Sequence, residues 1–272
     1  MTALASYCHA RSAQGRWLLR IEDVDTPRVV QGASDLILYT LENFGFEWDG
    51  EVRYQSRQFS RYEEIVQDLL HSKQLYACQC SRKYLARKNL ARGPLGKIYP
   101  GFCRERKLDS TVLSLRLNLE YANTIKFKDA HYGELELNLP QQVGDIVLKR
   151  IDGVYAYHLA VVIDDHDQQV TQVVRGADLL EVSCIHLYLY QLLKFPVPDY
   201  LHIPVVKNAN GSKLSKQTGA TGIQTKNASL QLWQALSYLG QDFSKDWISA
   251  TPSEILRQAI QQWNPLTIPG PE

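Results

Sequence analysis

The chain of 272 residues is long enough for about two domains, and its 44% hydrophobic and 22% charged residues are typical of a globular protein. It contains no run of about 18 apolar residues and no secretory signal pattern after Met1, which excludes a membrane-spanning helix and predicts a cytoplasmic protein. The 30 basic and 29 acidic residues leave a net charge of +1, so any binding of nucleic acid requires a local basic patch.

The first part of the chain has the pattern of an α/β fold. A helix is predicted from Thr2 to a C-cap at Gly15, then a buried strand over 17–23 and a second helix over 33–44, which closes at Gly45. Alternation of strand and helix is typical of a parallel sheet. An amphipathic helix over residues 62–70 follows.

The middle of the chain departs from that pattern. Residues 81–107, here called the basic segment, contain nine basic residues and one acidic residue, so their net charge is +8 and the rest of the chain carries −7. Such a run either forms a solvated helix face or contacts a polyanion. Alternating polar and apolar residues predict two hairpins, over residues 124–138 and 146–157. We therefore expect an insertion within the α/β core.

The α/β pattern returns at Tyr157 and leads into a small helical domain. A capping box of Thr251 and Glu254 opens the last helix. The elements before it are, in order, a helix over 157–162, a strand over 172–175, a helix over 179–194, a strand over 201–206 and a helix over 230–239.

The five cysteines, an odd number, argue against a disulfide framework. Cys78 and Cys80 form a C-x-C pair, and Cys103 lies in the basic segment with Tyr99 close before it. Three thiolates and one further donor would bind Zn²⁺, and a structural zinc would hold the basic segment in shape. Three ordinary buried thiols are the alternative. Two cysteines on apolar helical patterns are predicted core thiols: Cys8 and Cys184.

Acidic residues follow the first predicted strand. Ligands bind at the carboxyl ends of strands in open α/β sheets, so Glu22, Asp23 and Asp25 could hold a ligand ammonium group there. A local set of salt bridges with Arg20 and Arg28 is the alternative, and the pair of Asp25 with Arg28 favours it.

The second half of the chain contains two further constellations. Tyr157 and Arg175 occupy adjoining elements, and Arg175 could pair with a ligand carboxylate. The glycine-led loop 211–217 carries two lysines that could meet triphosphate charge, with a solvated turn as the alternative. In the Asp-Asp-His run at 164–166, consecutive helical residues point apart, which favours capping and ion pairs over a metal site. Histidines without ligand spacing are predicted to be structural: His9, His71, His131, His186 and His202.

Together these features resemble the catalytic core of class I glutamyl-tRNA synthetases. The set of Cys78, Cys80, Tyr99 and Cys103, and the roughly 55 residues after the Lys-Leu-Ser-Lys loop, are more similar to the short paralogous family of glutamyl-queuosine tRNA(Asp) synthetases. Val161 also favours the short paralogues, because full-length synthetases usually carry Asn there. The matching stretches are Trp-Leu-Leu-Arg-Ile-Glu-Asp-Val-Asp-Thr-Pro-Arg at 17–28, Tyr-His-Leu-Ala-Val-Val-Ile-Asp-Asp-His at 157–166, Val-Arg-Gly-Ala-Asp-Leu at 174–179 and Lys-Leu-Ser-Lys-Gln at 213–217.

The resemblance implies a Rossmann-like parallel sheet with a zinc-bearing insertion and a C-terminal helical domain. It also implies an enzyme, expected as a monomer, that uses ATP with Mg²⁺ to form glutamyl-adenylate and transfers glutamate to the queuosine base in the tRNA(Asp) anticodon, not to the 3′ end. The implied domains are the first half of the core at 1–74, the basic insertion at 75–145, the second half of the core at 146–200, and the loop and helical domain at 201–272.

The resemblance also assigns roles to single residues. Glu22 would hold the ammonium group of glutamate, Tyr157 would line its pocket and Arg175 would bind a substrate carboxylate. Lys216 would be catalytic by steadying the ATP phosphates, and the basic segment could contact tRNA phosphates. The ATP-binding loop would comprise Lys213, Leu214, Ser215, Lys216 and Gln217. The zinc ligands would be Cys78, Cys80, Cys103 and, as an unusual fourth, the phenolate of Tyr99.

The sequence departs from this family at its start. The family opens with a strand resembling Arg-Phe-Ala-Pro-Ser-Pro-Ser-Gly and a HIGH-like ATP signature, whereas residues 1–13 align with the helix after them, and His131-Tyr-Gly is no substitute. We therefore expect poor ATP binding from this chain, either because its only methionine, Met1, is internal to a longer reading frame or because the chain is a non-catalytic relative. The alternatives to the implied function are a fragment of a conventional glutamyl-tRNA synthetase and a non-catalytic, zinc-stabilised tRNA-binding module.

Overall fold

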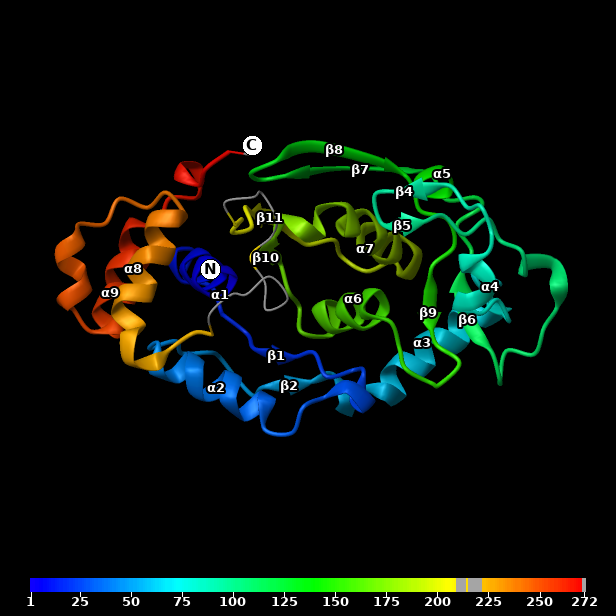
Figure 1. The fold of residues 1–272 in the computed structure, drawn as a ribbon, viewed down its shortest axis with the longest axis horizontal. Coiled ribbons are helices and arrows are strands. Elements are labelled where there is room, and N and C mark those ends of the chain that lie inside the picture. Colours follow the sequence, from blue (N-terminus) through cyan, green and yellow to red (C-terminus); the bar gives the residue numbers. More distant parts are fainter. Residues whose placement is uncertain (209–213, 215–221, 271–272) are drawn as a thin grey trace.

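The computed structural model describes residues 1–208, 214 and 222–270 (Figure 1). Within these residues, no helix combines the length and the apolar surface that crossing a bilayer requires. The helices are α1 (Thr2–Ser12), α2 (Ala33–Asn43), α3 (Phe59–His71), α4 (Arg82–Ala86), α5 (Leu139–Gln142), α6 (Tyr157–Asp167), α7 (Leu180–Leu193), α8 (Ala228–Tyr238) and α9 (Pro252–Gln262). The strands are β1 (Arg20–Ile21), β2 (Arg53–Tyr54), β3 (Leu75–Cys78), β4 (Arg92–Gly93), β5 (Gly96–Lys97), β6 (Ser114–Leu117), β7 (Thr124–Asp129), β8 (Gly133–Asn138), β9 (Val147–Lys149), β10 (Gln172–Gly176) and β11 (Asp199–Ile203).

Parallel strand pairing, expected for the α/β core, is confirmed in the described residues. β1 pairs with β2 and β10 pairs with β11, both in parallel, as two separate two-stranded sheets. Helix α6 leads into β10, and α7 connects β10 to β11, so the second pair is a strand–helix–strand unit. This order places the start of α6 and the carboxyl end of β10 within one unit of the fold.

The predicted strand over residues 17–23 is shorter than expected, with only Arg20–Ile21 in a regular ladder. The backbone N–H of Trp17 is bonded to the carboxylate of Asp49 at 2.8 Å, and its carbonyl accepts from the Asp49 N–H at 2.8 Å. One side chain thus takes over a backbone donor that a longer ladder would have used.

The insertion contains antiparallel sheets. The hairpin predicted over residues 124–138 is confirmed as β7 and β8, while β3, β6 and β9 form a three-stranded sheet. The hairpin predicted over 146–157 is only partly formed, because β9 pairs with β6 instead. Its turn is closed by a hydrogen bond of 2.8 Å from the Arg150 N–H to the Val154 carbonyl, and a single bridge joins Lys149 to Tyr155.

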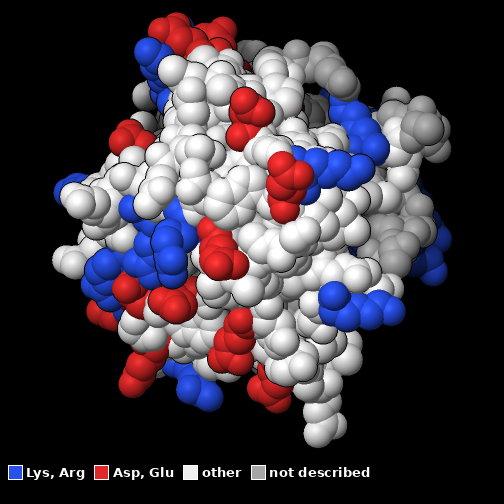
Figure 2. All heavy atoms as spheres, turned by 90° about the vertical axis from the view of Figure 1, so that its left-hand side faces the viewer, with Lys and Arg blue, Asp and Glu red and all other residues white. Residues whose placement is uncertain are grey.

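Two large hydrophobic clusters form the interior of the described chain. One lies among α3, α6, α7 and the three-stranded sheet. The other joins α1 to α8 and α9, at the left of Figure 1, and contains the edge-to-face rings of Tyr7, Trp17 and Phe46. The predicted capping box of α9 is present, with the Thr251 N–H bonded to the Glu254 carboxylate at 2.8 Å. Figure 2 faces this helical end and shows acidic and basic side chains interspersed on it.

Candidate active site and metal centre

Arg175, in β10, carries a buried guanidinium with only 7% of the residue exposed. Its Nε donates to Nε2 of His202 at 3.2 Å, and its Nη2 donates to Oγ of Ser183 at 2.7 Å. Its Nη1 donates to Nδ1 of His186 at 3.1 Å, and the guanidinium lies 5.2 Å from the ring centre of Tyr200. No carboxylate of the described residues forms an ion pair with it. A buried cation held only by neutral groups is costly, so this arrangement is suited to receive an anion.

Tyr157 and Glu22 are brought to Arg175 from other elements. Tyr157 begins α6, and its hydroxyl accepts from Nη1 of Arg175 at 3.5 Å. Glu22 follows β1 and keeps 44% of its side chain exposed, with its carboxylate 3.7 Å from Arg20. Partial burial raises the pKa of Glu22, whereas the charges of Arg20 and Arg175 lower it and the charge of Asp165 raises it. The site therefore combines a buried anion-binding side chain, Arg175, with a partly exposed cation-binding one, Glu22.

Asp164 and Asp165 of α6 form ion pairs, as the sequence predicted. The carboxylate of Asp164 is fully buried and accepts from Arg53 at 2.9 Å and from the hydroxyl of Tyr62 at 2.8 Å. Asp165 pairs with Arg20 at 2.9 Å. These bonds fix α6 against β1 and β2, which places Tyr157 relative to Glu22.

The other acids after β1 have local partners. The carboxylate of Asp23 accepts from the N–H and the hydroxyl of Ser56, at 2.8 and 2.6 Å. Asp25 pairs with Arg28 at 2.7 Å, which confirms the salt bridge given above as the alternative, and also with Arg150 at 3.1 Å. Their carboxylates are thus engaged in holding the loop after β1.

A chain of hydrogen bonds passes through Arg175 and was missed from the sequence. Because a guanidinium can only donate, the ring nitrogens of His202 and His186 that face it must accept. His202 therefore donates from Nδ1 to Asp129 at 2.7 Å, and His186 donates from Nε2 to Nδ1 of His158 at 3.2 Å. Burial and the charge of Arg175 lower the pKa of His158 to about 4 and that of His186 well below its usual value. The rings of His158 and His186 are therefore neutral near pH 7. The sequence analysis missed this chain of hydrogen bonds because its members are far apart in the sequence and form no short motif.

The predicted metal ligands converge. The sulfur atoms of Cys78, Cys80 and Cys103 lie within 4.8 Å of one another, with Cys80 and Cys103 3.6 Å apart. The hydroxyl of Tyr99 lies 3.3 Å from Cys78 and 3.4 Å from Cys80. A tetrahedral zinc with Zn–S bonds of about 2.3 Å separates its sulfur ligands by roughly 3.8 Å, so the four atoms fit such an ion. Although burial raises the pKa of the Cys103 thiol, hydrogen bonds from Tyr99 and the Gln79 N–H lower it to about 7.

A buried arginine supports the cluster from β6. Arg116 donates from Nε to the sulfur of Cys78 at 3.2 Å, and its guanidinium lies 3.9 Å from the ring centre of Tyr99. Its Nη1 donates to the Asp145 carbonyl at 2.7 Å. Gly144 has φ +69, and a Cβ there would lie 2.5 Å from the Tyr99 carbonyl, so the close approach of the two loops requires glycine.

Comparison with known proteins places the chain in a family. A family model described as "tRNA synthetases class I (E and Q), catalytic domain" matches residues 1–233. The chain belongs to this synthetase family. The protein named "Glutamyl-Q tRNA(Asp) synthetase" of Pseudomonas putida is 45% identical to this synthetase over 268 residues, covering 98% of this chain and 87% of the relative. The protein of the same name from Pseudomonas aeruginosa is 44% identical over 272 residues, covering 99% and 89%.

A solved structure agrees with the fold of this synthetase. The glutamate-tRNA synthetase from Elizabethkingia anophelis superimposes with a TM-score of 0.79 at 22% identity, over 98% of this chain and 62% of that one. This synthetase therefore spans less than two thirds of that chain. The likeness confirms a class I synthetase catalytic fold, and membership of the family confirms a ligase-type enzyme. The predicted domain limits and the zinc-bearing character of the insertion stay predictions.

Most cations of the synthetase's basic segment are exposed, but two have internal partners. Arg104 makes two hydrogen bonds, of 2.7 and 2.9 Å, to Asp145 and pairs with Glu120 at 3.0 Å. The ammonium of Lys97 donates to carbonyls at the end of α4. The exposed basic residues are Arg82, Lys83, Arg87, Lys88, Arg92, Lys97, Arg106 and Lys107.

The predicted ATP-binding loop of the synthetase is described at one position. Leu214 is 40% exposed, and its N–H donates to the Val206 carbonyl at 2.7 Å, which ties this residue to the segment after β11. The other members, Lys213, Ser215, Lys216 and Gln217, lie outside the described residues. The catalytic role predicted for Lys216 stays a prediction.

Proposed function

We propose that this synthetase activates L-glutamate with ATP and transfers the glutamyl group to the queuosine base in the anticodon of tRNA(Asp). The observation that carries the proposal is the buried guanidinium of Arg175, whose direct partners in the described chain are all neutral. The relatives named Glutamyl-Q tRNA(Asp) synthetase support the choice of substrate and acceptor.

Arg175 has a donor to spare for a substrate carboxylate. A guanidinium has five N–H donors, and the four bonds described above leave one N–H on Nη2. The carboxylate would supply the missing negative charge and could also accept from the Tyr157 hydroxyl. The exposed carboxylate of Glu22 would pair with the ammonium group of the same glutamate, and that pairing would offset the rise in its pKa.

Adenylate formation then needs cations at the ATP phosphates. A carboxylate oxygen of glutamate attacks the α-phosphorus of ATP, the bond to pyrophosphate breaks, and pyrophosphate leaves. By the resemblance, the ammonium group of Lys216 would stabilise the negative charge that develops on the phosphates, with the rest of loop 213–217 around them. In the second step the acceptor on tRNA takes the glutamyl group, and AMP leaves.

We further propose that Cys78, Cys80, Cys103 and the Tyr99 phenolate hold a structural zinc. The distances among these donors match a tetrahedral ion, and Arg116 supplies a positive charge beside the thiolates. When bound, zinc would cross-link residues 78–80 to residues 99–103. It would so hold the exposed cations of the basic segment in fixed positions. Those cations would contact the backbone of the tRNA(Asp) anticodon arm.

Pyrophosphate exchange with ATP that depends on glutamate tests the activation step. The site of labelled glutamate on tRNA(Asp) tests the transfer step, since the proposal places it on the queuosine base. Label on the 3′ adenosine would instead support a conventional glutamyl-tRNA synthetase. Absence of exchange in a folded, zinc-loaded protein that also carries the family's opening strand and HIGH-like signature would refute the proposed activity.

A further inference from the structure

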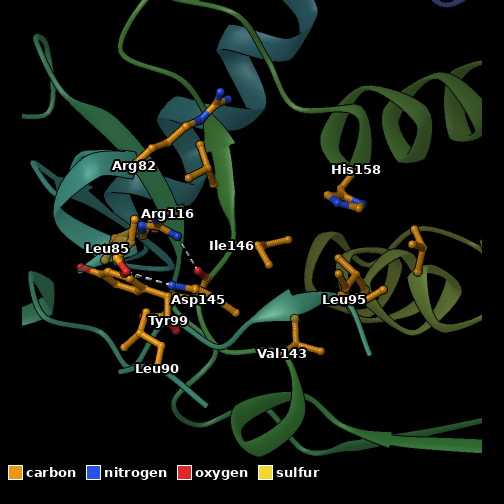
Figure 3. A pocket seen from close by; sticks show the side chains of 15 residues that line it. Arg82, Leu85, Leu90, Leu95, Tyr99, Arg116, Val143, Asp145, Ile146 and His158 are labelled. Atoms are coloured by element: carbon orange, nitrogen blue, oxygen red, sulfur yellow. Dashed lines mark hydrogen bonds between the residues drawn. The ribbon is translucent and has the colours of Figure 1, made fainter. Parts of the chain in front are cut away.

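A cavity of about 540 Å³ lies where α4 and the loops around the cysteine cluster face α6 and α7 (Figure 3). Its wall is mainly apolar, with Leu85, Leu90 and Leu95 from the basic segment and Val182 and Ile185 from α7. Such walls suit the two faces of a flat ring system. The size exceeds what one amino acid side chain would need and is in the range of small-molecule sites.

One ring N–H on this wall has no hydrogen-bond partner in the described chain. His158 lines the cavity, opposite Tyr99 and Arg116 in Figure 3. Its Nδ1 accepts from His186, and its ring is neutral, so its proton is on Nε2. No hydrogen bond from Nε2 to a described residue occurs. His158 thus offers a single N–H donor. Its tautomer is fixed by the hydrogen bonds that run from Arg175 through His186 to His158.

The cavity also has cations of the basic segment on its wall. Arg82 is exposed and makes no hydrogen bond or ion pair with the described residues. Lys97 lies on the same wall, whereas Arg116 and Asp145 are bonded to each other. A ligand with one hydrogen-bond acceptor, flat apolar faces and a negative group would use all of these features. A purine or pyrimidine nucleotide has this combination.

We propose that this cavity binds one nucleotide unit, with an acceptor atom of its base bonded to the N–H of His158 and its phosphate near Arg82. The nucleotide comes either from an unpaired position of the RNA substrate or from the free pool. For the RNA source, the inference rests on the proposed function. Two cations of the basic segment, Arg82 and Lys97, lie on the cavity wall and would face the RNA backbone. It adds a binding site that is separate from the side chains around Glu22 and Tyr157.

The test follows the imidazole signals of His158 by NMR in the full chain loaded with zinc. The two probes are guanosine 5′-monophosphate and a hairpin RNA with the unpaired loop of an anticodon arm. A shift with the hairpin supports the RNA source, and a shift with the free nucleotide alone supports the free source. No shift with either probe overturns the proposal, and this result needs no variant to fold.

Two pairs of variants add binding data. His158→Phe keeps the ring and removes the donor, so we expect the affinity for guanosine 5′-monophosphate to fall about tenfold, the value of one hydrogen bond. His71→Phe, at an exposed position in α3, should leave it unchanged. Arg82→Ala should weaken nucleotide binding about threefold to tenfold, while Arg257→Ala, exposed on α9 and not part of the wall, should not. Equal affinities in all four variants would overturn the proposal.

Pyrophosphate exchange separates this inference from the proposed function. Glutamate-dependent exchange with no shift of His158 would overturn the cavity proposal alone. A shift of His158 in a protein that carries the family's opening strand and HIGH-like signature but shows no exchange would refute the activity and leave the nucleotide site standing.

Discussion

Replacing Arg175 by Lys keeps the charge but removes the planar fork of donors. The guanidinium reaches three internal acceptors, on His202, Ser183 and His186, at 2.7 to 3.2 Å in different directions. An ammonium group donates from one point and cannot reach all of them. With one or two bonds lost at about 1 kcal/mol each, the free energy of unfolding should fall by about 1–2 kcal/mol.

The effect on glutamate binding should be larger. A lost hydrogen bond between charged groups costs about 1.5–3 kcal/mol, so the Kd for L-glutamate should rise roughly 10- to 150-fold. Calorimetric titration with glutamate and urea unfolding measure the two quantities on the same samples. Arg28→Lys is the matched control, because that side chain is 68% exposed and pairs only at the surface with Asp25. Wild-type glutamate affinity in the Arg175→Lys protein would refute the assignment of Arg175 to the substrate carboxylate.

Three further predictions concern the metal cluster, the anchor of His202 and the basic segment. Tyr99→Phe should lower zinc affinity at least about tenfold in competition with a chelator, whereas the exposed Tyr84→Phe should not. Asp129→Asn should lower the free energy of unfolding by about 2 kcal/mol at pH 7, because an amide donor would then face donor groups. Although burial raises the pKa of Asp129, hydrogen bonds hold it below its usual value, so its contribution is present above about pH 4 and is lost as the pH falls through the folded pKa. Arg87→Ala with Lys88→Ala should weaken tRNA(Asp) binding and reduce the slope of its salt dependence by about 2.

Matched variants on other surfaces control for these predictions. Asp242→Asn, at an exposed position, is the control for Asp129→Asn and should leave the free energy of unfolding unchanged. An equal loss of stability in these two variants would contradict a special role for the buried carboxylate of Asp129. Lys245→Ala with Arg257→Ala removes the same charge from the helical end. If this double variant weakens tRNA binding as much as Arg87→Ala with Lys88→Ala does, the basic segment is not the tRNA-binding surface.

The elements that follow from local patterns were predicted well from the sequence. The helix at the start of the chain, the hairpin around Gly133 and the capping box at Thr251 each depend on periodicity or turn chemistry within a few residues. The strand over residues 17–23 was predicted too long, because the distant Asp49 takes its first donor. Local sequence cannot reveal such a partner.

In the candidate site, too, local features were predicted from the sequence and contacts between distant residues were not. The sequence singled out Glu22, Tyr157 and Arg175, and the folded chain brings them together. It treated His186 and His202 as structural, because their importance comes from contact with Arg175 across three elements. Counting charge along the basic segment likewise could not show that Asp145 neutralises Arg104, since the two are 41 positions apart.

The packing of α1 against α8 and α9 has a consequence for synthesis on the ribosome. Nε1 of Trp263 donates to Nδ1 of His9 at 3.2 Å, across 254 positions of the chain. The apolar face of α1, with Leu4 and Tyr7, is therefore made before α8 and α9 and is fully covered only after they have emerged. Contacts of such sequence separation form slowly, and a nascent chain displays this face until its final helices emerge. Translation that stops before α9 should thus yield an aggregation-prone product, whose exposed apolar face a chaperone would have to bind.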